Sequence, residues 1–197
     1  MRIETIVRRD KVMNAYDFDK TIFDGDSTAR FYRYCLLRTP KMFLRLPRLA
    51  VEAVFVLPKN KQRFKENMFA FLRDLRNPEK MLDDFWKKNR KRIKKFYLAK
   101  KREDDLIASA SPEFLLRPVL ATLGITRLIA SPVDFHTGKY SGPNCHGQEK
   151  VIRFFDEFPG ESIENFYSDS HSDDPMADIA ENAHLVRGEK IMGWNER

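Results

Sequence analysis

The segment Tyr16-Asp17-Phe18-Asp19-Lys20-Thr21 decides the fold, because it ends an apolar run over residues 12–16 that is typical of a buried strand. Ligands of open α/β sheets bind outside the carboxyl ends of the strands, so Asp17 and Asp19 are positioned to share one site. Two neighbouring carboxylates raise each other's pKa unless a cation neutralises them, and hard oxygen ligands suit Mg²⁺. An acidic turn after a strand gives the same short pattern, so the motif needs support from the rest of the chain.

The composition indicates a globular protein of one domain with room for a large insertion. The chain has 197 residues, of which 42% are hydrophobic and 33% are charged. The longest apolar stretch, residues 46–57, is interrupted by Pro47, Arg48 and Glu52 and is shorter than the roughly 18 residues of a membrane span. The sequence therefore predicts no membrane-spanning helix.

The cysteines and the N-terminal sequence bear on the compartment. The chain has two cysteines, Cys35 and Cys145, and residues 1–11 are charged, with no apolar segment typical of a signal peptide. We expect residues 1–11 to form an exposed lead-in and the two thiols to be reduced. These features predict a cytoplasmic protein without disulfides.

The net charge of +7 is distributed unevenly along the chain. Residues 30–102 hold 23 of the 36 Lys and Arg but 6 of the 29 Asp and Glu, a net charge of +17, whereas the remainder carries −10. Such asymmetry indicates a polyanionic partner, either nucleic acid or an anionic membrane surface. A set of well-solvated helix faces explains the same charges equally well.

The hydrophobic periodicity divides the chain into two kinds of structure. Apolar residues at helical spacing predict helices over residues 27–38, 42–57, 64–75 and 81–97, the second kinked at Pro47, with no strand among them. Strands are then predicted at 105–109, 126–131, 163–168 and 184–186, alternating with helices at 112–123, 146–158 and 175–181, and with a hairpin or loop at 135–143. This alternation predicts a parallel sheet, with an all-helical module inserted after the first strand.

Polar residues follow several of the predicted strands. Ser109-Ala110-Ser111 leads from a strand into a helix, where a hydroxyl and free backbone N–H groups can bind a phosphate, although Ser is also a common N-cap. Lys150 begins a later helix and is equally compatible with a solvent-exposed lysine. Asp169 and Asp173 belong to an acidic cluster after a strand, and the preference of helix N-termini for Asp accounts for Asp173 but not for Asp169.

In this order, the Asp-x-Asp-x-Thr motif, the serine after a strand, the lysine and the acidic cluster resemble the haloacid dehalogenase-like (HAD) phosphohydrolase superfamily. The position of the helical module resembles that superfamily's C1-type cap and the phosphoserine-phosphatase-like subgroup, HAD-IB. The resemblance implies a Rossmann-like parallel sheet formed by residues 1–24 and 103–197, with the basic helical cap at residues 25–102. Lys20 stands where many members have glycine.

The resemblance also implies a mechanism and a set of site residues. Asp17 would attack phosphorus and form an aspartyl-phosphate, and Asp19 would act as the general acid and base. Mg²⁺ would be held by the Asp17 side chain, the Asp19 carbonyl and Asp169. Ser109, the Ala110 N–H and Lys150 would bind the phosphate oxygens, and Asp173 would support the metal ligands. Asp26 would contact the substrate, although an N-cap is the favoured alternative for this residue.

Finer likenesses concern the substrate. The runs 31–40, 145–150 and 167–175 resemble bacterial phosphatidylglycerophosphatases of type C, although this cap stretch is less hydrophobic. The expected substrate is a small phosphomonoester or a phospholipid head-group phosphate, with peripheral contact at the inner face of an anionic membrane.

Two alternatives use the same scaffold: a phosphotransferase, and a non-catalytic protein whose basic cap, with the aromatic residues Phe85, Trp86, Phe96 and Tyr97, binds an anionic partner. Because all four catalytic positions are present, the sequence favours an enzyme over a nucleic-acid-binding protein.

Overall fold

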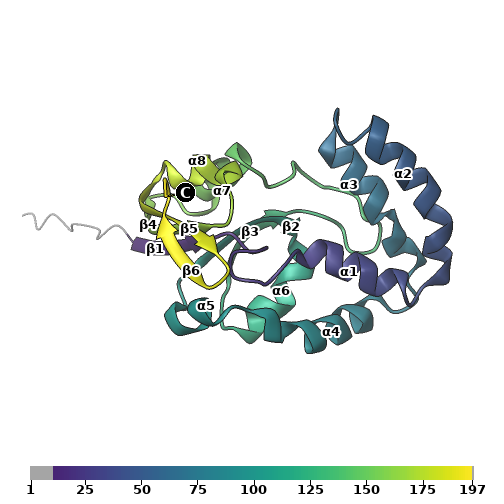
Figure 1. The fold of residues 1–197 in the computed structure, drawn as a ribbon, viewed down its shortest axis with the longest axis horizontal. Helices are drawn as coiled ribbons and strands as arrows, with labels where there is room; N and C mark the ends of the chain where they lie inside the picture. Colours follow the sequence, from purple (N-terminus) through teal and green to yellow (C-terminus); the bar gives the residue numbers. More distant parts are fainter. Residues whose placement is uncertain (1–10, 197) are drawn as a thin grey trace, which may run out of the picture.

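The computed structural model describes residues 11–196 and contains a six-stranded sheet with the order β3-β2-β1-β4-β5-β6 (Figure 1). All neighbouring strands are parallel except β5 and β6, which are antiparallel. The first strand in the sequence therefore lies between β2 and β4, near the middle of the sheet. This arrangement confirms the predicted α/β class with a mostly parallel sheet. The strands are β1 (Lys11–Tyr16), β2 (Leu106–Pro112), β3 (Arg127–Ser131), β4 (Glu161–Ser168), β5 (Ala180–Arg187) and β6 (Lys190–Gly193).

Helices cover both faces of the sheet, because the side chains of the central strands alternate between two apolar clusters. Met13 and Ala15 of β1 belong to one cluster, together with residues of α7 (Gln148–Glu157) and α8 (Asp174–Ala177). Tyr16 belongs to the other, together with residues of α6 (Glu113–Thr122) and of the helices that precede β2. The alternation is the period of two that a strand imposes on its side chains.

The segment between β1 and β2 is helical, as the sequence predicts, and Figure 1 shows most of its helices in an arc at one end of the molecule, with the last one beside the sheet. Two of its predicted helices are each divided. The helix predicted over residues 42–57 is a 3₁₀ helix, η1 (Pro40–Arg45), followed by α2 (Leu46–Phe55), because Pro47 occupies the first turn of a new helix, where its missing N–H leaves no bond unmade. The one predicted over residues 81–97 is α4 (Pro78–Asn89), η3 (Arg90–Arg92) and α5 (Lys95–Lys100).

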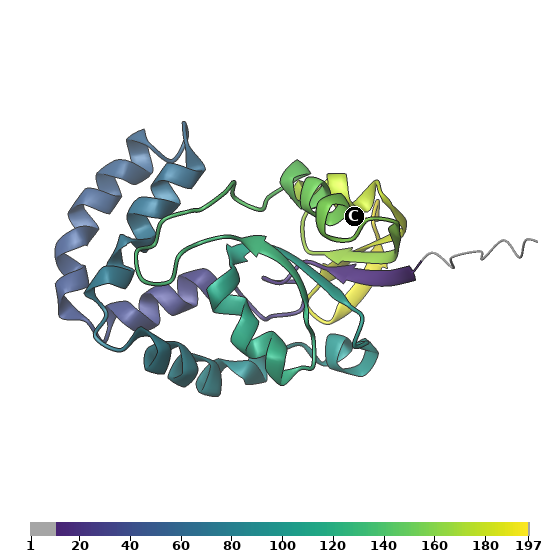
Figure 2. The same ribbon diagram turned by 180° about the vertical axis from the view of Figure 1, so that it is seen from behind.

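The first and third helices of this segment match their predictions more closely. They are α1 (Ser27–Leu36) and α3 (Lys61–Phe69), the latter continued by η2 (Ala70–Asp74). The connection between β3 and α7 extends from the sheet to α3 and η2 (Figure 2). There, Gln62 Nε2 donates to the Gly142 carbonyl at 3.3 Å and Arg73 Nε donates to the Thr137 carbonyl at 3.1 Å. The helical segment is thus tied to the sheet through this loop as well as through its own ends.

The C-terminal part differs from the prediction at its boundaries. The helix predicted at 175–181 is shorter and begins earlier, with η4 (His171–Asp173) leading into α8, because β5 starts at Ala180. The antiparallel strand β6 was not predicted. It follows a turn at Gly188 and Glu189 and pairs with β5 from Arg187 back to His184.

Three further predictions concern the cysteines, the membrane and the N-terminus. Cys35 and Cys145 are buried and unpaired with each other, as expected. Within residues 11–196, none of the helices is long and apolar enough to cross a membrane. The predicted lead-in lies outside the described residues, except for Lys11, which begins β1.

Candidate active site

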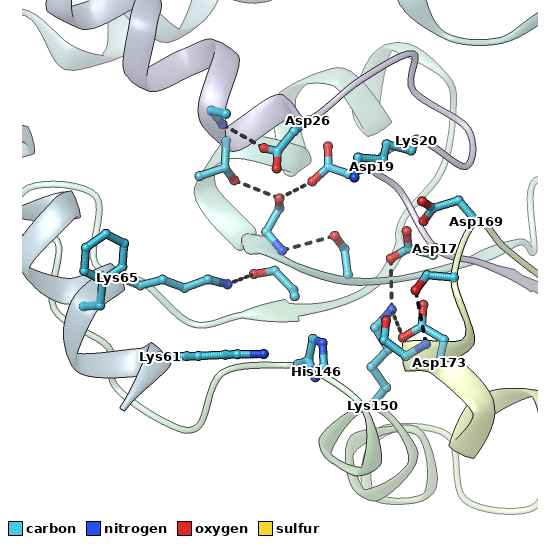
Figure 3. A pocket seen from close by; sticks show the side chains of 18 of the residues that line it. Asp17, Asp19, Lys20, Asp26, Lys61, Lys65, His146, Lys150, Asp169 and Asp173 are labelled. Atoms are coloured by element: carbon cyan, nitrogen blue, oxygen red, sulfur yellow. Dashed lines mark hydrogen bonds and ion pairs between the residues drawn. The ribbon is translucent and has the colours of Figure 1, made fainter. Parts of the chain in front are cut away.

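The predicted site residues from three strands meet at one edge of the sheet. Asp17 follows β1, the Ser109–Ser111 segment ends β2, and Asp169 follows β4, so parallel pairing brings all three to the carboxyl edge. They line a cleft of about 470 Å³ between this edge and helix α3, shown in Figure 3.

Asp17 forms a buried ion pair with Lys150, which also contacts Asp173. The Lys150 ammonium lies 2.9 Å from Asp17 Oδ1 and 2.8 Å from Asp173 Oδ1, and Lys150 is 1% exposed. Burial raises the pKa of the Asp17 carboxyl, and the Lys150 ammonium opposes that shift. Asp173 also accepts a hydrogen bond from Ser168 Oγ at 2.8 Å. Asp173 therefore positions Lys150 directly.

Asp19 is held by the start of α1 and by Ser111. The Ser27 N–H donates to Asp19 Oδ1 at 2.6 Å, and Ser111 Oγ donates to Asp19 Oδ2 at 2.5 Å. Thr28 Oγ1 is 2.8 Å from the same Ser111 hydroxyl. Burial raises the pKa of Asp19 to about 6, even though these hydrogen bonds favour the carboxylate. A carboxyl with a pKa near neutrality can both give and take a proton at physiological pH.

An irregularity in β2 shapes the floor of the cleft. The pairing of β2 with β3 shifts register between Ser109 and Pro112, and such bulges redirect side chains next to functional sites. The Ser111 N–H donates to Ser109 Oγ at 3.2 Å, while the Ala110 carbonyl accepts from Ser131 Oγ at 3.0 Å. Ser109, Ala110 and Ser111 all line the cleft. The sequence pointed to Ser109 and Ala110, and the contact with Asp19 adds Ser111.

Asp169 and Asp17 are linked through the threonine of the motif. Thr21 Oγ1 donates to Asp17 Oδ2 at 3.3 Å and accepts the Asp169 N–H at 2.9 Å. Burial raises the pKa of the half-buried Asp169, and the charge of Lys20 opposes the shift. Lys20 has φ of 60°, the left-handed region that glycine adopts without strain. Lysine at this position therefore carries a backbone strain that glycine would not.

The oxygen ligands at this edge fit a hard cation with a shell of water. Asp17 and Asp169 point into the same cleft, and burial raises the pKa of each, which an adjacent cation would reverse. In the part of the chain that the structure describes, no three His, Cys, Asp or Glu side chains lie together as a metal site. Two carboxylates and a backbone carbonyl would leave several coordination positions to water, which is the arrangement that Mg²⁺ prefers in proteins.

Asp26 caps helix α1. Its Oδ1 accepts the Ala29 N–H at 2.7 Å, which is the N-cap alternative that the sequence left open. Asp26 also lines the cleft.

The wall of the cleft opposite Asp17 comes from the helical segment and was not predicted. Phe64 and Met68 fall in the helix predicted over residues 64–75, and the sequence gave Lys61 and Lys65 no role. The structure shows that these residues, with Leu57 and His146, face the cleft. Only the docking of α3 over the sheet reveals this. The i, i+4 spacing of Lys61 and Lys65 is the one signal that the sequence offers, because it puts both on one helix face.

Comparisons with known proteins agree with the fold and the motifs. The model of the haloacid dehalogenase-like hydrolase family matches residues 15–178. Two curated proteins of Mycobacterium tuberculosis, one described as a probable phosphatase and one as uncharacterized, are 30% identical over 105 residues, which cover 46% of this chain. The matched part spans about 37% of the length of these relatives.

Solved structures show the same fold at low sequence identity. A protein of unknown function from Bordetella pertussis Tohama I superposes with a TM-score of 0.72 at 19% identity, covering 88% of this chain and 89% of that one. A probable phosphoserine phosphatase from Vibrio cholerae superposes with a TM-score of 0.63 at 13% identity, covering 88% of this chain and 55% of that one. A substrate-bound phosphoserine phosphatase superposes with a TM-score of 0.52 at 14% identity, covering 89% and 85%.

Proposed function

Because the chain belongs to the haloacid dehalogenase-like hydrolase family, we propose that it is a Mg²⁺-dependent phosphatase that acts through an aspartyl-phosphate on Asp17. The main support is the pairing, in one cleft, of the Asp17–Lys150 ion pair with Asp19, a second carboxyl whose pKa is raised to about 6. A nucleophile whose negative charge is favoured by a buried lysine, next to an acid of near-neutral pKa, suits phosphoryl transfer.

The proposed reaction has two steps. Asp17 attacks phosphorus in line, the bond from phosphorus to the ester oxygen breaks, and the leaving oxygen takes the proton of Asp19. Asp19 then removes a proton from water, the water oxygen bonds to phosphorus, and the bond from phosphorus to Asp17 breaks to release inorganic phosphate. Ser111 and the Ser27 N–H would orient Asp19 throughout, through the bonds they already make to its two oxygens.

The phosphoryl oxygens would be held by groups from β2 and α7. Lys150 has three N–H donors, of which Asp17 and Asp173 use two, so one is free to bind a phosphoryl oxygen. Ser109 Oγ and the Ala110 N–H would bind the others. When bound by Asp17, Asp169 and the Asp19 carbonyl, Mg²⁺ would supply charge neutralisation at phosphorus.

We also propose the division of the chain into a core, residues 1–24 and 103–197, and a cap, residues 25–102. The helical content of the segment between β1 and β2 supports it. The cap contributes one wall of the cleft and would thereby select substrates. The likeness to phosphatidylglycerophosphatases of type C suggests a lipid head-group phosphate beside small phosphomonoesters such as phosphoserine.

A Mg²⁺-dependent screen tests the activity. The native protein is expected to hydrolyse p-nitrophenyl phosphate, and Asp17→Asn should abolish this hydrolysis. Asp156→Asn is the matched control, because Asp156 is an exposed aspartate on α7 outside the cleft. Normal hydrolysis by Asp17→Asn would refute the mechanism. Adding alcohols as acceptors separates the phosphatase from the phosphotransferase alternative, because only the latter forms a new phosphate ester.

An exposed apolar surface on η1 and α2 favours a second candidate role, peripheral contact with an anionic membrane. No residue of α2 is buried, and Leu44, Val51, Val54 and Phe55 are 57–83% exposed. Arg48 is exposed on the same helix, and the charge of +17 over residues 30–102 complements anionic lipid. We propose that this surface contacts the bilayer.

Liposome sedimentation tests the membrane contact. The native protein is expected to co-sediment with anionic vesicles at low salt, and the double variant Val54→Ser/Phe55→Ser to stay in the supernatant. Ile152→Ser is the control, since Ile152 is an apolar residue that is 49% exposed on α7, outside the cap. Equal retention of both variants would refute the contact.

The burial of three cap aromatics gives no support to the nucleic-acid form of the non-catalytic alternative. Phe85, Trp86 and Tyr97 are at most 5% exposed, and Trp86 Nε1 donates to the Leu115 carbonyl at 2.7 Å. Side chains packed in this way cannot stack on the bases of a nucleic acid.

A further inference from the structure

Helix α3 presents two cations to the cleft from the side opposite the acidic groups. Figure 3 shows Lys61 and Lys65 pointing into the cleft, across from Asp17 and Lys150. Most of the carboxylates that line the cleft follow β1 and β4, with Asp26 at the start of α1, whereas these two lysines come from α3 of the cap. The cleft is therefore electrostatically two-sided.

Lys65 is a partly buried ammonium held by neutral groups. Its Nζ donates to Asn144 Oδ1 at 2.7 Å and to the Ala110 carbonyl at 3.1 Å. Between residues 11 and 196, no carboxylate lies within the 4.0 Å of an ion pair from Lys65, or from Lys61. Burial lowers the pKa of Lys65, and the charges of Asp26 and Asp19, which do not contact it, oppose the shift only in part.

A charge removed from water without a counterion is unfavourable, and the free energy improves when an anion binds to it. Lys65 has a third N–H donor that neither Asn144 nor Ala110 uses. The contrast with Lys150 is direct, because Lys150 has two carboxylates in contact. Lys150 is thus compensated by the protein, whereas Lys65 lacks a partner that a ligand can provide.

Building on the proposed phosphatase function, we propose that Lys61 and Lys65 bind a second negative charge, carried by the leaving group of the substrate. The substrate class is then a phosphomonoester whose alcohol carries a carboxylate or a further phosphate. Leu57, Phe64 and Met68 line the same wall and would contact the carbon chain between the two anions. Such chemistry is found both in soluble metabolites and in lipid head groups.

The test is a matched substrate series. The native protein is assayed with ω-carboxyalkyl phosphates of two to five methylenes, with n-alkyl phosphates of the same length and with ω-aminoalkyl phosphates. One charge-assisted hydrogen bond corresponds to about a tenfold or greater preference. We expect kcat/KM for the best carboxylate to exceed that for its uncharged analogue by at least about tenfold, and the amines to be the poorest substrates.

Variants locate the preference. In Lys65→Met and in Lys61→Met, the ratio of kcat/KM for the carboxylate to that for its uncharged analogue should fall by about fivefold or more. Lys59→Met is the matched control, since Lys59 is an exposed lysine between α2 and α3 that does not line the cleft, and its ratio should equal the native one. Lys61 is exposed, so Lys61→Met keeps the test valid if Lys65→Met does not fold.

The outcomes separate this inference from the phosphatase proposal. If no phosphate ester is hydrolysed, the function itself fails. The second-anion site is refuted if alkyl phosphates are hydrolysed but the ratio of kcat/KM for the carboxylate to that for the uncharged analogue is near one. It is also refuted if this ratio falls as much in Lys59→Met as in the Lys61 and Lys65 variants. Calorimetric binding of the matching phosphonates to the native protein and to Lys61→Met reports the same preference without turnover. Adding a dihexanoylglycerol tail to the substrate distinguishes the two sources. A further rise in kcat/KM indicates a lipid head group, whereas an unchanged kcat/KM indicates a soluble substrate.

Discussion

The buried contact of Lys150 with Asp17 and Asp173 gives the sharpest prediction about stability. We consider Lys150→Met, which keeps most of the side-chain volume but removes the charge. Lys150 is 1% exposed and lies within 2.9 Å of both carboxylates. Without it, the two carboxylates would face each other in a buried site, and the protein relieves this by keeping one of them protonated.

The size of the effect follows from the pKa of that carboxyl. An aspartate with an ordinary pKa of 3.8 that stays protonated at pH 7 costs about 4 kcal/mol, at about 1.4 kcal/mol per pH unit. Because its pKa is raised in the folded state, the folded protein binds more protons than the unfolded chain above pH 3.8. The free energy of unfolding therefore falls as the pH rises, and it falls faster in Lys150→Met than in the native protein.

Urea denaturation at two pH values, with chelator present to exclude metal ions, measures this. We expect Lys150→Met to be close to native stability near pH 4.5 and less stable near pH 7.5 by up to about 4 kcal/mol, an upper bound because the Asp17 pKa is already raised in the native protein. Adding Asp173→Asn should recover much of the loss at the higher pH, because it removes one of the two carboxylates, while phosphatase activity stays lost. Equal destabilisation at both pH values would refute the reasoning, since a loss of packing does not depend on pH.

Three further substitutions test single features of the fold. Gly138→Ala should lower the free energy of unfolding by more than about 2 kcal/mol, because a Cβ there would lie 2.4 Å from the Phe69 carbonyl oxygen. Gly124→Ala is the control, since Gly124 has a similar φ and open space around it; equal losses of stability in urea would contradict the prediction. Asp105→Asn should raise stability at pH 7 by up to about 3 kcal/mol and remove a decline between about pH 4 and 6, because burial raises the pKa of Asp105 to about 6; no change in the pH dependence would contradict it. Lys20→Gly should raise stability by up to about 1 kcal/mol by relieving the left-handed backbone, and a loss in thermal unfolding would contradict it.

The sequence predicted the sheet and the residues at its carboxyl edge because those signals are local. A buried strand followed directly by polar residues can be recognised from about ten residues of sequence. Parallel pairing then brings the carboxyl ends of neighbouring strands to the same edge of the sheet. Asp17, Asp19, Ser109 and Asp169 were found in this way, and they lie in one cleft. Pro47 signalled the interruption of the second helix, whereas the break near Arg90 was missed because the periodicity continues across it.

Contacts between distant segments left no such signal. Ser111 was seen as part of a strand end, and its bond to Asp19 depends on the bulge that turns the chain at Ser109. Asp173 was expected to support metal ligands, which stays a prediction, and its contact with Lys150 was not predicted. Both contacts join residues whose spacing in the sequence is arbitrary, so pattern reasoning could identify the participants but not their partners.

The cap shows why substrate choice is harder to read than chemistry. Asp17 and Asp169 directly follow paired strands, and Lys150 and Asp173 are buried beside them, so strand pairing and burial constrain these positions. The wall that faces them is set by how α3 docks, through contacts such as Lys65 with Asn144 and Gly138 with Phe69. A helix can keep its amphipathic pattern while its docking angle changes, so the same sequence signal is compatible with many cleft walls. A lysine that the protein leaves without an anion is visible only in the folded structure, and there it indicates what the ligand must carry.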